Sequence, residues 1–64
     1  MTVRDLKKGD FFTLKDIANP TEKQVFIRGE YDKSDKAFCC GRFDDISYSR
    51  MLKPNTKVFV DFIF

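Results

Sequence analysis

One stretch of the chain, residues 24–43, constrains the fold more than any other, because it predicts a β-hairpin. Residues 25–31 and 36–43 are rich in β-branched and aromatic side chains and lack the apolar spacing of a helix. Residues 32–35 between them are wholly polar, and Asp and Ser side chains can bond their own backbone in a tight turn. The rest of the chain is expected to pack against this hairpin.

Alternation along the two strands predicts which face of the hairpin meets the core. Successive side chains in a strand point to opposite faces. We assign the more apolar set to the core, and the set that mixes one Phe per strand with charges to the outside. The glycine in each strand predicts a bulge or a sharp bend. The core set is Val25, Ile27, Gly29, Tyr31, Ala37, Cys39, Gly41 and Phe43, and the outer set is Phe26, Arg28, Glu30, Phe38, Cys40 and Arg42.

The segment before the hairpin predicts a turn, a strand and a long loop. Residues 2–10 are typical of a single helical or 3-10 turn, followed by a positive-φ corner at Gly9. A first strand is expected over residues 11–15, and a mobile, turn-rich loop over residues 16–23. In that strand the inward residues are Phe12 and Leu14, and the outward ones are Phe11, Thr13 and Lys15.

The segment after the hairpin predicts two turns and a last strand. Turns are expected at residues 44–47 and 53–56, the second containing Pro54. Residues 48–52 leave two alternatives open, a short strand or one helical turn that puts Tyr48, Met51 and Leu52 on a single face. The last strand is expected over residues 57–64, with Val58, Val60 and Phe62 inward and Phe59, Asp61 and Ile63 outward.

Length and composition predict one small domain, residues 1–64. A chain of 64 residues is near the lower limit for independent folding. Its eight Phe and two Tyr supply enough apolar surface for a compact core without a metal or a disulfide, because each aromatic side chain can bury about 150–250 Å². Little core is left to spare, so a homodimer stays an open alternative.

The charge balance bears on location and partners. Twelve basic and ten acidic residues give a net charge of +2, which argues against a nucleic-acid-binding arm or a polybasic membrane anchor. No apolar run approaches the roughly 20 residues of a spanning helix, and the N-terminus lacks the apolar core of a signal peptide. We therefore expect a cytoplasmic protein that does not associate with membranes.

Several short strands linked by turns predict an all-β fold, namely a small antiparallel five-stranded barrel or curled sheet with a short helical turn. The sequence Leu6-x-x-Gly9-Asp10 before the first strand, the longer loop after it and the central hairpin resemble the SH3-like barrels. The chain also resembles a group of small, functionally uncharacterised all-β proteins of Bacteroides-type bacteria. The matching segments are residues 8–14, 28–32, 43–45 and 57–60. Neither resemblance implies an activity for any residue.

Nothing in the sequence indicates catalysis. The chain has no His, and the adjacent Cys39 and Cys40 cannot bridge each other, since neighbours on a strand point to opposite faces. We expect Cys39 to be buried and Cys40 to be the more exposed thiol, with no base close in sequence. The pair Asp44-Asp45 is typical of a solvated turn, and no glycine-rich phosphate loop is present. The prediction is a protein that is not an enzyme and has no cofactor, no metal and no evident small-molecule substrate.

The predicted outer face suggests binding instead. Four predicted strands each place one Phe on this face, with cations beside them and Lys15 and Lys57 at its margin. Aromatic rings interleaved with cations suit single-stranded nucleic acid, because bases stack on the rings and cations track the phosphates. The candidate binding residues are Phe11, Phe26, Arg28, Phe38, Arg42 and Phe59.

Three hypotheses explain this face. It is a second small core, a dimer or partner-protein interface, or a nucleic-acid site, and Glu30 and Asp61 on the same face oppose the last. An unpaired last strand at residues 57–64 would also present an edge that can accept another strand. The sequence therefore favours a binding module for a protein partner or a second copy, with single-stranded nucleic acid as the alternative.

Overall fold

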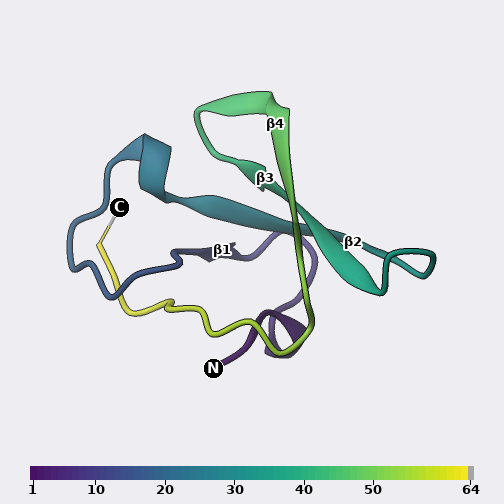
Figure 1. Ribbon diagram of the computed structural model, residues 1–64. Coiled ribbons are helices and arrows are strands. Elements are labelled where there is room, and N and C mark those ends of the chain that lie inside the picture. The colour runs from purple at the N-terminus through teal and green to yellow at the C-terminus, as the bar shows by residue number, and fades with distance from the viewer. Residues whose placement is uncertain (64) are drawn as a thin grey trace.

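The chain folds into one four-stranded antiparallel sheet that curls around a small core (Figure 1). The computed structural model describes residues 1–63, and at Ile46 the backbone alone. The strand order β1-β2-β3-β4 follows the chain, and the sheet is not closed. The predicted all-β class is confirmed, whereas the sheet has four strands in place of the expected five. The elements are η1 (Val3–Asp5), β1 (Phe11–Phe12), η2 (Glu22–Gln24), β2 (Phe26–Asp32), β3 (Ala37–Arg42) and β4 (Asp45–Leu52), where η marks a 3-10 turn.

The central hairpin forms as predicted. Strands β2 and β3 are antiparallel, and the polar residues between them make the turn. The carboxylate of Asp32 accepts hydrogen bonds from the N–H groups of Ser34 and Asp35, at 2.8 and 3.3 Å. The chain re-enters the sheet through Lys36, whose φ of 51° is left-handed. The side chain of Asp32 therefore organises the turn in the way its sequence predicted.

The strands are irregular at both predicted glycine positions. Arg28 lies opposite Cys40 and Tyr31 lies opposite Phe38, so two residues of β2 face a single residue of β3. A second irregularity lies after Gly41, where β3 pairs with β4. The bulge in β2 inserts one extra residue, so each side chain beyond it lies on the opposite face from the one that simple alternation predicts. Tyr31 is therefore on the same face as Phe38, not on the opposite face as predicted.

The predicted choice of core face is wrong for most of the hairpin, although Val25 and Ala37 are buried as predicted, at 0% and 3% exposed. Phe26, Phe38 and Cys40, all expected outside, are only 7%, 6% and 0% exposed. The predicted core residues Tyr31 and Phe43 are exposed. The physical reason is that the N-terminal turn and the C-terminal segment cover the face of Phe26 and Phe38, and their apolar side chains complete the core there. The core cluster consists of Val3, Leu6, Phe12, Phe26, Phe38, Cys40, Leu52 and Val58, with Leu14 packed against it.

The two cysteines exchange their predicted roles. Cys40 is fully buried, while Cys39 lies half-buried on the other face. Burial raises the pKa of the Cys40 thiol above its ordinary value. The Cys40 sulfur lies 3.8 Å from the carbonyl oxygen of Phe38, the distance of a weak S–H hydrogen bond. Cys40 thus behaves as a small hydrophobic core residue.

The N-terminal segment confirms most of its predictions. A 3-10 turn forms at Val3–Asp5, and Gly9 has a φ of 94°. Phe12 points into the core and Phe11 is exposed, as expected. The regular part of β1 ends at Phe12, and Thr13, expected outside, is completely buried.

Thr13 tolerates burial because all its polar groups are satisfied. Its hydroxyl donates to the carbonyl of Lys15 at 2.6 Å. Its N–H and C=O pair with Phe59 at 2.9 and 3.0 Å. A buried polar group of this kind costs little when it is fully hydrogen-bonded.

The second hairpin is tighter than predicted. The connection between β3 and β4 is the two-residue turn Phe43-Asp44, and β4 begins at Asp45, so the expected turn at 44–47 is wrong. Of the two alternatives for residues 48–52, the strand is correct. The turn at residues 53–56 is confirmed, closed by a hydrogen bond from the N–H of Thr56 to the carbonyl of Lys53 at 3.0 Å.

The C-terminal segment does not form the predicted strand. Within residues 57–63 it makes only isolated bridges, from Lys57 to Thr2 and from Phe59 to Thr13, and residue 64 lies outside the described residues. The segment runs beside β1 (Figure 1), and the N–H of Ile63 donates a hydrogen bond to the carbonyl of Ala18, at 2.9 Å, in the loop that follows β1. Val58 is buried as expected, whereas Val60, expected inside, is exposed.

None of the helical turns in residues 1–63 is long or apolar enough to cross a membrane.

Candidate functional site

The six predicted binding residues do not form one surface. Phe26 and Phe38 are core residues, and the guanidinium carbon of Arg28 lies 4.2 Å from the centre of the Phe38 ring. Phe11 belongs to the opposite face, because its register partner is Ile27. The remaining two residues, Arg42 and Phe59, are half-buried and lie apart. Arg42 is at the end of β3, and Phe59 is on the C-terminal segment. The Lys57 amine lies 5.5 Å from the centre of the Phe59 ring. Because Phe26 and Phe38 are buried, they cannot contribute to an exposed aromatic binding surface.

The face of the sheet opposite the core carries an uncharged strip instead. The register aligns Phe11, Ile27, Gly41 and Ser49 in one row across all four strands, and Cys39 and Met51 in the next row. Phe11 and Met51 are exposed. The ring of Phe11 also meets that of Phe43 edge to face, with centroids 5.6 Å apart. We call these six aligned residues the outer strip.

Strand β4 contributes Ser49 and Met51 to this strip and forms one end of the sheet. It pairs with β3 along one edge only. Among the described residues, none of 45–52 makes a backbone hydrogen bond outside the pairing with β3. The side chains of Ser47, Tyr48, Ser49, Arg50 and Met51 are all exposed. The outer edge of β4 is therefore open to another strand.

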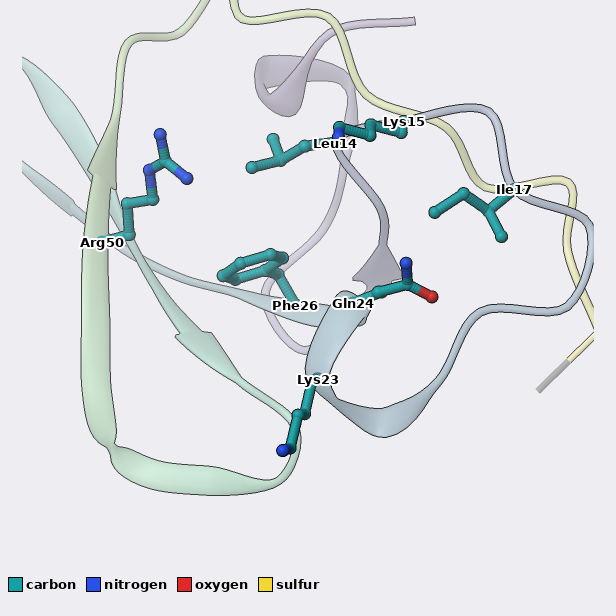
Figure 2. A pocket seen from close by; sticks show the side chains of 7 residues that line it. All are labelled: Leu14, Lys15, Ile17, Lys23, Gln24, Phe26 and Arg50. Atoms are coloured by element: carbon teal, nitrogen blue, oxygen red, sulfur yellow. The ribbon is translucent and has the colours of Figure 1, made fainter.

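A pocket of about 190 Å³ opens on the core side of the sheet, between the loop after β1, the start of β2 and Arg50 of β4 (Figure 2). Its apolar wall consists of Leu14, Ile17 and Phe26. Its polar lining comes from Lys15, Lys23, Gln24 and Arg50, so three cations and no carboxylate border the space. We call this space the cationic pocket.

The polar groups of the cationic pocket differ in direction. In Figure 2 the guanidinium of Arg50 extends toward Leu14, and the Lys15 amine lies close to Leu14 as well. The Lys23 amine points away from the other side chains. The Oε1 atom of Gln24 accepts the N–H of Thr21 at 2.9 Å. This bond fixes the amide plane, so the Gln24 amide nitrogen remains available as a donor.

The cations of the pocket are not neutralised by acids. The ion pairs found in residues 1–63 join Lys8 with Glu30, and Arg42 Nε with Asp44 Oδ1 at 2.6 Å. Lys15 and Arg50 belong to neither pair. Their charge is therefore available to an anionic ligand, whereas that of Arg42 is already matched.

Two of the carboxylates with a lowered pKa are tied into turns, whereas the pKa of a third, Glu30, is lowered by its hydrogen bond from Lys8. Hydrogen bonds from Ser47 lower the pKa of Asp45, and hydrogen bonds from Thr2 lower the pKa of Asp5. Both carboxylates accept bonds from residues two or three positions away, which is the pattern of turn and cap stabilisation. In the part of the chain that the structure describes, no three potential metal ligands come together.

Sequence reasoning missed the cationic pocket. Its lining residues come from the loop after β1, from η2, from the start of β2 and from β4, so no periodic pattern unites them. The one signal was compositional, because Lys15 and Lys23 flank a loop that holds an apolar Ile17. The placement of Arg50 opposite this loop depends on the curl of the sheet and is not encoded locally.

Comparison of the chain with known protein families, curated proteins and solved structures finds no match.

Proposed function

We propose that this protein is a non-enzymatic interaction module that binds an extended protein segment by strand addition along the outer edge of β4. The observation that carries the proposal is the eight-residue strand at the end of the sheet, whose outer edge makes no backbone pairs with residues 1–63. An open row of N–H and C=O groups is a template for another strand. The outer strip beside it would provide uncharged contacts for the added side chains.

A second copy of the chain is the partner we expect first. An antiparallel pairing of two β4 strands centred on Ser49 sets Ser47 opposite Met51 and Tyr48 opposite Arg50. The same register sets Asp45 opposite Lys53, a pair of opposite charges. No like charges face each other, and cross-strand pairs of this kind favour association. This version moves the strand-addition hypothesis from the C-terminal segment to β4.

We also infer that the sheet is an open relative of the SH3-like barrels. The support is the position of the two isolated bridges, which bring Lys57 and Phe59 next to the N-terminal turn and to Thr13. A fifth strand that closed such a barrel would pair with the first strand at this place.

The test is the oligomeric state of the purified chain over a wide range of concentration, measured by sedimentation velocity. We expect a concentration-dependent dimer. The variant Ser49→Lys places two ammonium groups at the centre of the paired edge and is expected to remain monomeric. The matched control is Ser34→Lys, which adds the same charge in the β2–β3 turn and leaves the dimer unchanged.

Hydrogen exchange provides the second readout. Outward-facing amides of β4 should become protected when a peptide with the sequence of residues 45–52 is added. A chain that stays monomeric and shows no protection of β4 by this peptide would rule out strand addition.

Single-stranded nucleic acid is the second candidate. It is favoured by the exposed ring of Tyr48, on which a base could stack. The guanidinium carbon of Arg42 lies 4.6 Å from the centre of this ring, and Arg50 follows two residues later. The ion pair of Arg42 with Asp44 opposes it, because that charge is matched. Oligonucleotide binding that weakens with salt and with Arg50→Ala would support this candidate over strand addition.

A further inference from the structure

We propose that the cationic pocket is a binding site for a carboxylate carried on a small apolar body, such as a single aromatic ring. The site lies on the core side of the sheet and not on the outer strip, although it shares Arg50 with strand β4. Its apolar wall would hold the body of the ligand, and its cationic rim would hold the carboxylate.

The volume of the pocket sets the size of the ligand. At about 190 Å³ it is slightly larger than an apolar cavity of about 150 Å³, which accommodates one benzene ring. It is smaller than the roughly 300–1,000 Å³ of sites for drug-sized ligands. The wall of Leu14, Ile17 and Phe26 consists of the same side-chain types that line such ring-binding cavities. A one-ring body, or a short branched aliphatic one, therefore fits the space.

The positive charge of the rim determines the charge that a ligand should carry. Three cations and no acid line the pocket, although the Lys23 amine points away from the other side chains (Figure 2). Neither Lys15 nor Arg50 has a carboxylate partner within residues 1–63. A neutral ligand would leave this positive charge uncompensated, and a cationic ligand would be repelled. The pocket is therefore complementary to an anion.

The donors at the rim favour a carboxylate. Arg50 presents a planar guanidinium that can bind both oxygens of a carboxylate at once. Gln24 adds an amide N–H donor whose orientation is fixed by its bond to the Thr21 N–H. Lys15 adds a point charge, and its backbone is held in place by the hydroxyl of Thr13. Much of the site is thus organised before the ligand arrives, which reduces the entropy lost on binding.

The test is an amide NMR titration of the isotope-labelled full chain with benzoate and 3-phenylpropionate. Benzamide and benzylamine serve as neutral and cationic analogues of the same size. We expect the two carboxylates to shift the amides of residues 14–17, 24–26 and 50, with dissociation constants of about 0.1–1 mM. The two analogues should bind at least about tenfold more weakly.

Substitution of the rim distinguishes a built site from general attraction. Arg50→Gln is expected to weaken benzoate about fivefold to tenfold, because it removes one charge-assisted hydrogen-bonding group. Lys15→Gln is a second variant, with a smaller loss. Lys33→Gln removes an equal charge from the exposed β2–β3 turn and should leave the affinity unchanged. The amide spectrum of each variant shows directly whether it is folded.

Two peptide ligands identify the source of the carboxylate. A short peptide ending in Phe with a free carboxylate would bind if the site recognises a chain end, and its amidated form would not. Binding of the free acids alone would assign the site to a small metabolite. Equal binding of benzoate and benzamide would overturn the proposal, as would the absence of shifts at about 10 mM benzoate or an equal loss in Arg50→Gln and Lys33→Gln.

Discussion

A Cβ atom on Gly29 would lie 2.1 Å from the carbonyl oxygen of Cys39, which is closer than non-bonded carbon and oxygen atoms can approach. The contact comes from the bulge in β2, where two residues face one residue of β3. The obstructing atom belongs to the backbone and cannot rotate away. The bulge therefore requires glycine at this position for reasons of space.

We predict that Gly29→Ala destabilises the protein by about 3 kcal/mol, the upper end of the cost of overpacking. Gly41→Ala is the matched control, since its Cβ atom would lie 3.7 Å from the nearest atom, the carbonyl oxygen of Tyr48, in ordinary contact. That variant should be neutral or more stable by up to about 1 kcal/mol, because alanine restricts the unfolded chain. Urea denaturation measures both. Equal effects of the two substitutions would contradict the role assigned to the bulge.

The hairpin was predictable from the sequence, whereas the face that it turns toward the core was not. The composition of residues 25–31 and 36–43 identifies the strands, and both glycines mark their irregularities. Each face of the hairpin, however, carries apolar residues, so alternation alone leaves two choices. The choice depends on the N-terminal turn and the C-terminal segment, which cover the Phe38 face. Those contacts are distant in sequence and leave no local pattern.

The other predictions divide in the same way. Most features that depend on neighbouring residues were predicted correctly, and most features that depend on contacts distant in sequence were not. The turns at residues 32–35 and 53–56 are local and were predicted correctly. The burial of Thr13 depends on its pairing with Phe59, and the cationic pocket depends on the position of Arg50 relative to Leu14. Such relationships arise only when the sheet curls, which a strand pattern does not specify.

The burial of Phe38 gives a second prediction. Phe38→Leu should destabilise the protein by about 1–2 kcal/mol, because it reshapes a packed core and removes the ring under the Arg28 guanidinium. Phe11→Leu changes an exposed ring on the outer strip and should cost less than half as much. Chemical denaturation of both variants measures the two losses in the free energy of unfolding. A larger loss for Phe11→Leu would mean that the two faces of the sheet are assigned in reverse.

The N-terminal 3-10 turn gives a third prediction. The Asp5 carboxylate accepts hydrogen bonds from the N–H and hydroxyl of Thr2 at 2.9 and 3.1 Å, which lower the pKa of Asp5. A lowered pKa means that the stabilisation is present above the ordinary pKa and is lost as the pH falls through the folded value. Asp5→Ala should therefore lower the melting temperature at neutral pH and have little effect in strong acid.

The control for this prediction is Asp35→Ala, a carboxylate of the β2–β3 turn for which no side-chain hydrogen bond is found among the described residues. Thermal melts of both variants across the acidic range should separate them. If Asp5→Ala lowers the melting temperature equally at all pH values, the effect belongs to packing and not to the charged carboxylate.

The burial of Cys40 gives the last prediction. In the folded protein an alkylating reagent should modify the half-buried Cys39 and leave Cys40 unmodified until the chain unfolds. Burial also raises the pKa of the Cys40 thiol, so the folded state retains a proton that the unfolded state releases. Stability should therefore fall as the pH rises above the ordinary thiol value of about 8.5. Cys40→Ala should have lower stability at neutral pH but a weaker decline in alkali, measured by urea denaturation. Modification of Cys40 as fast as Cys39 in the native state would show that the core is open at this position.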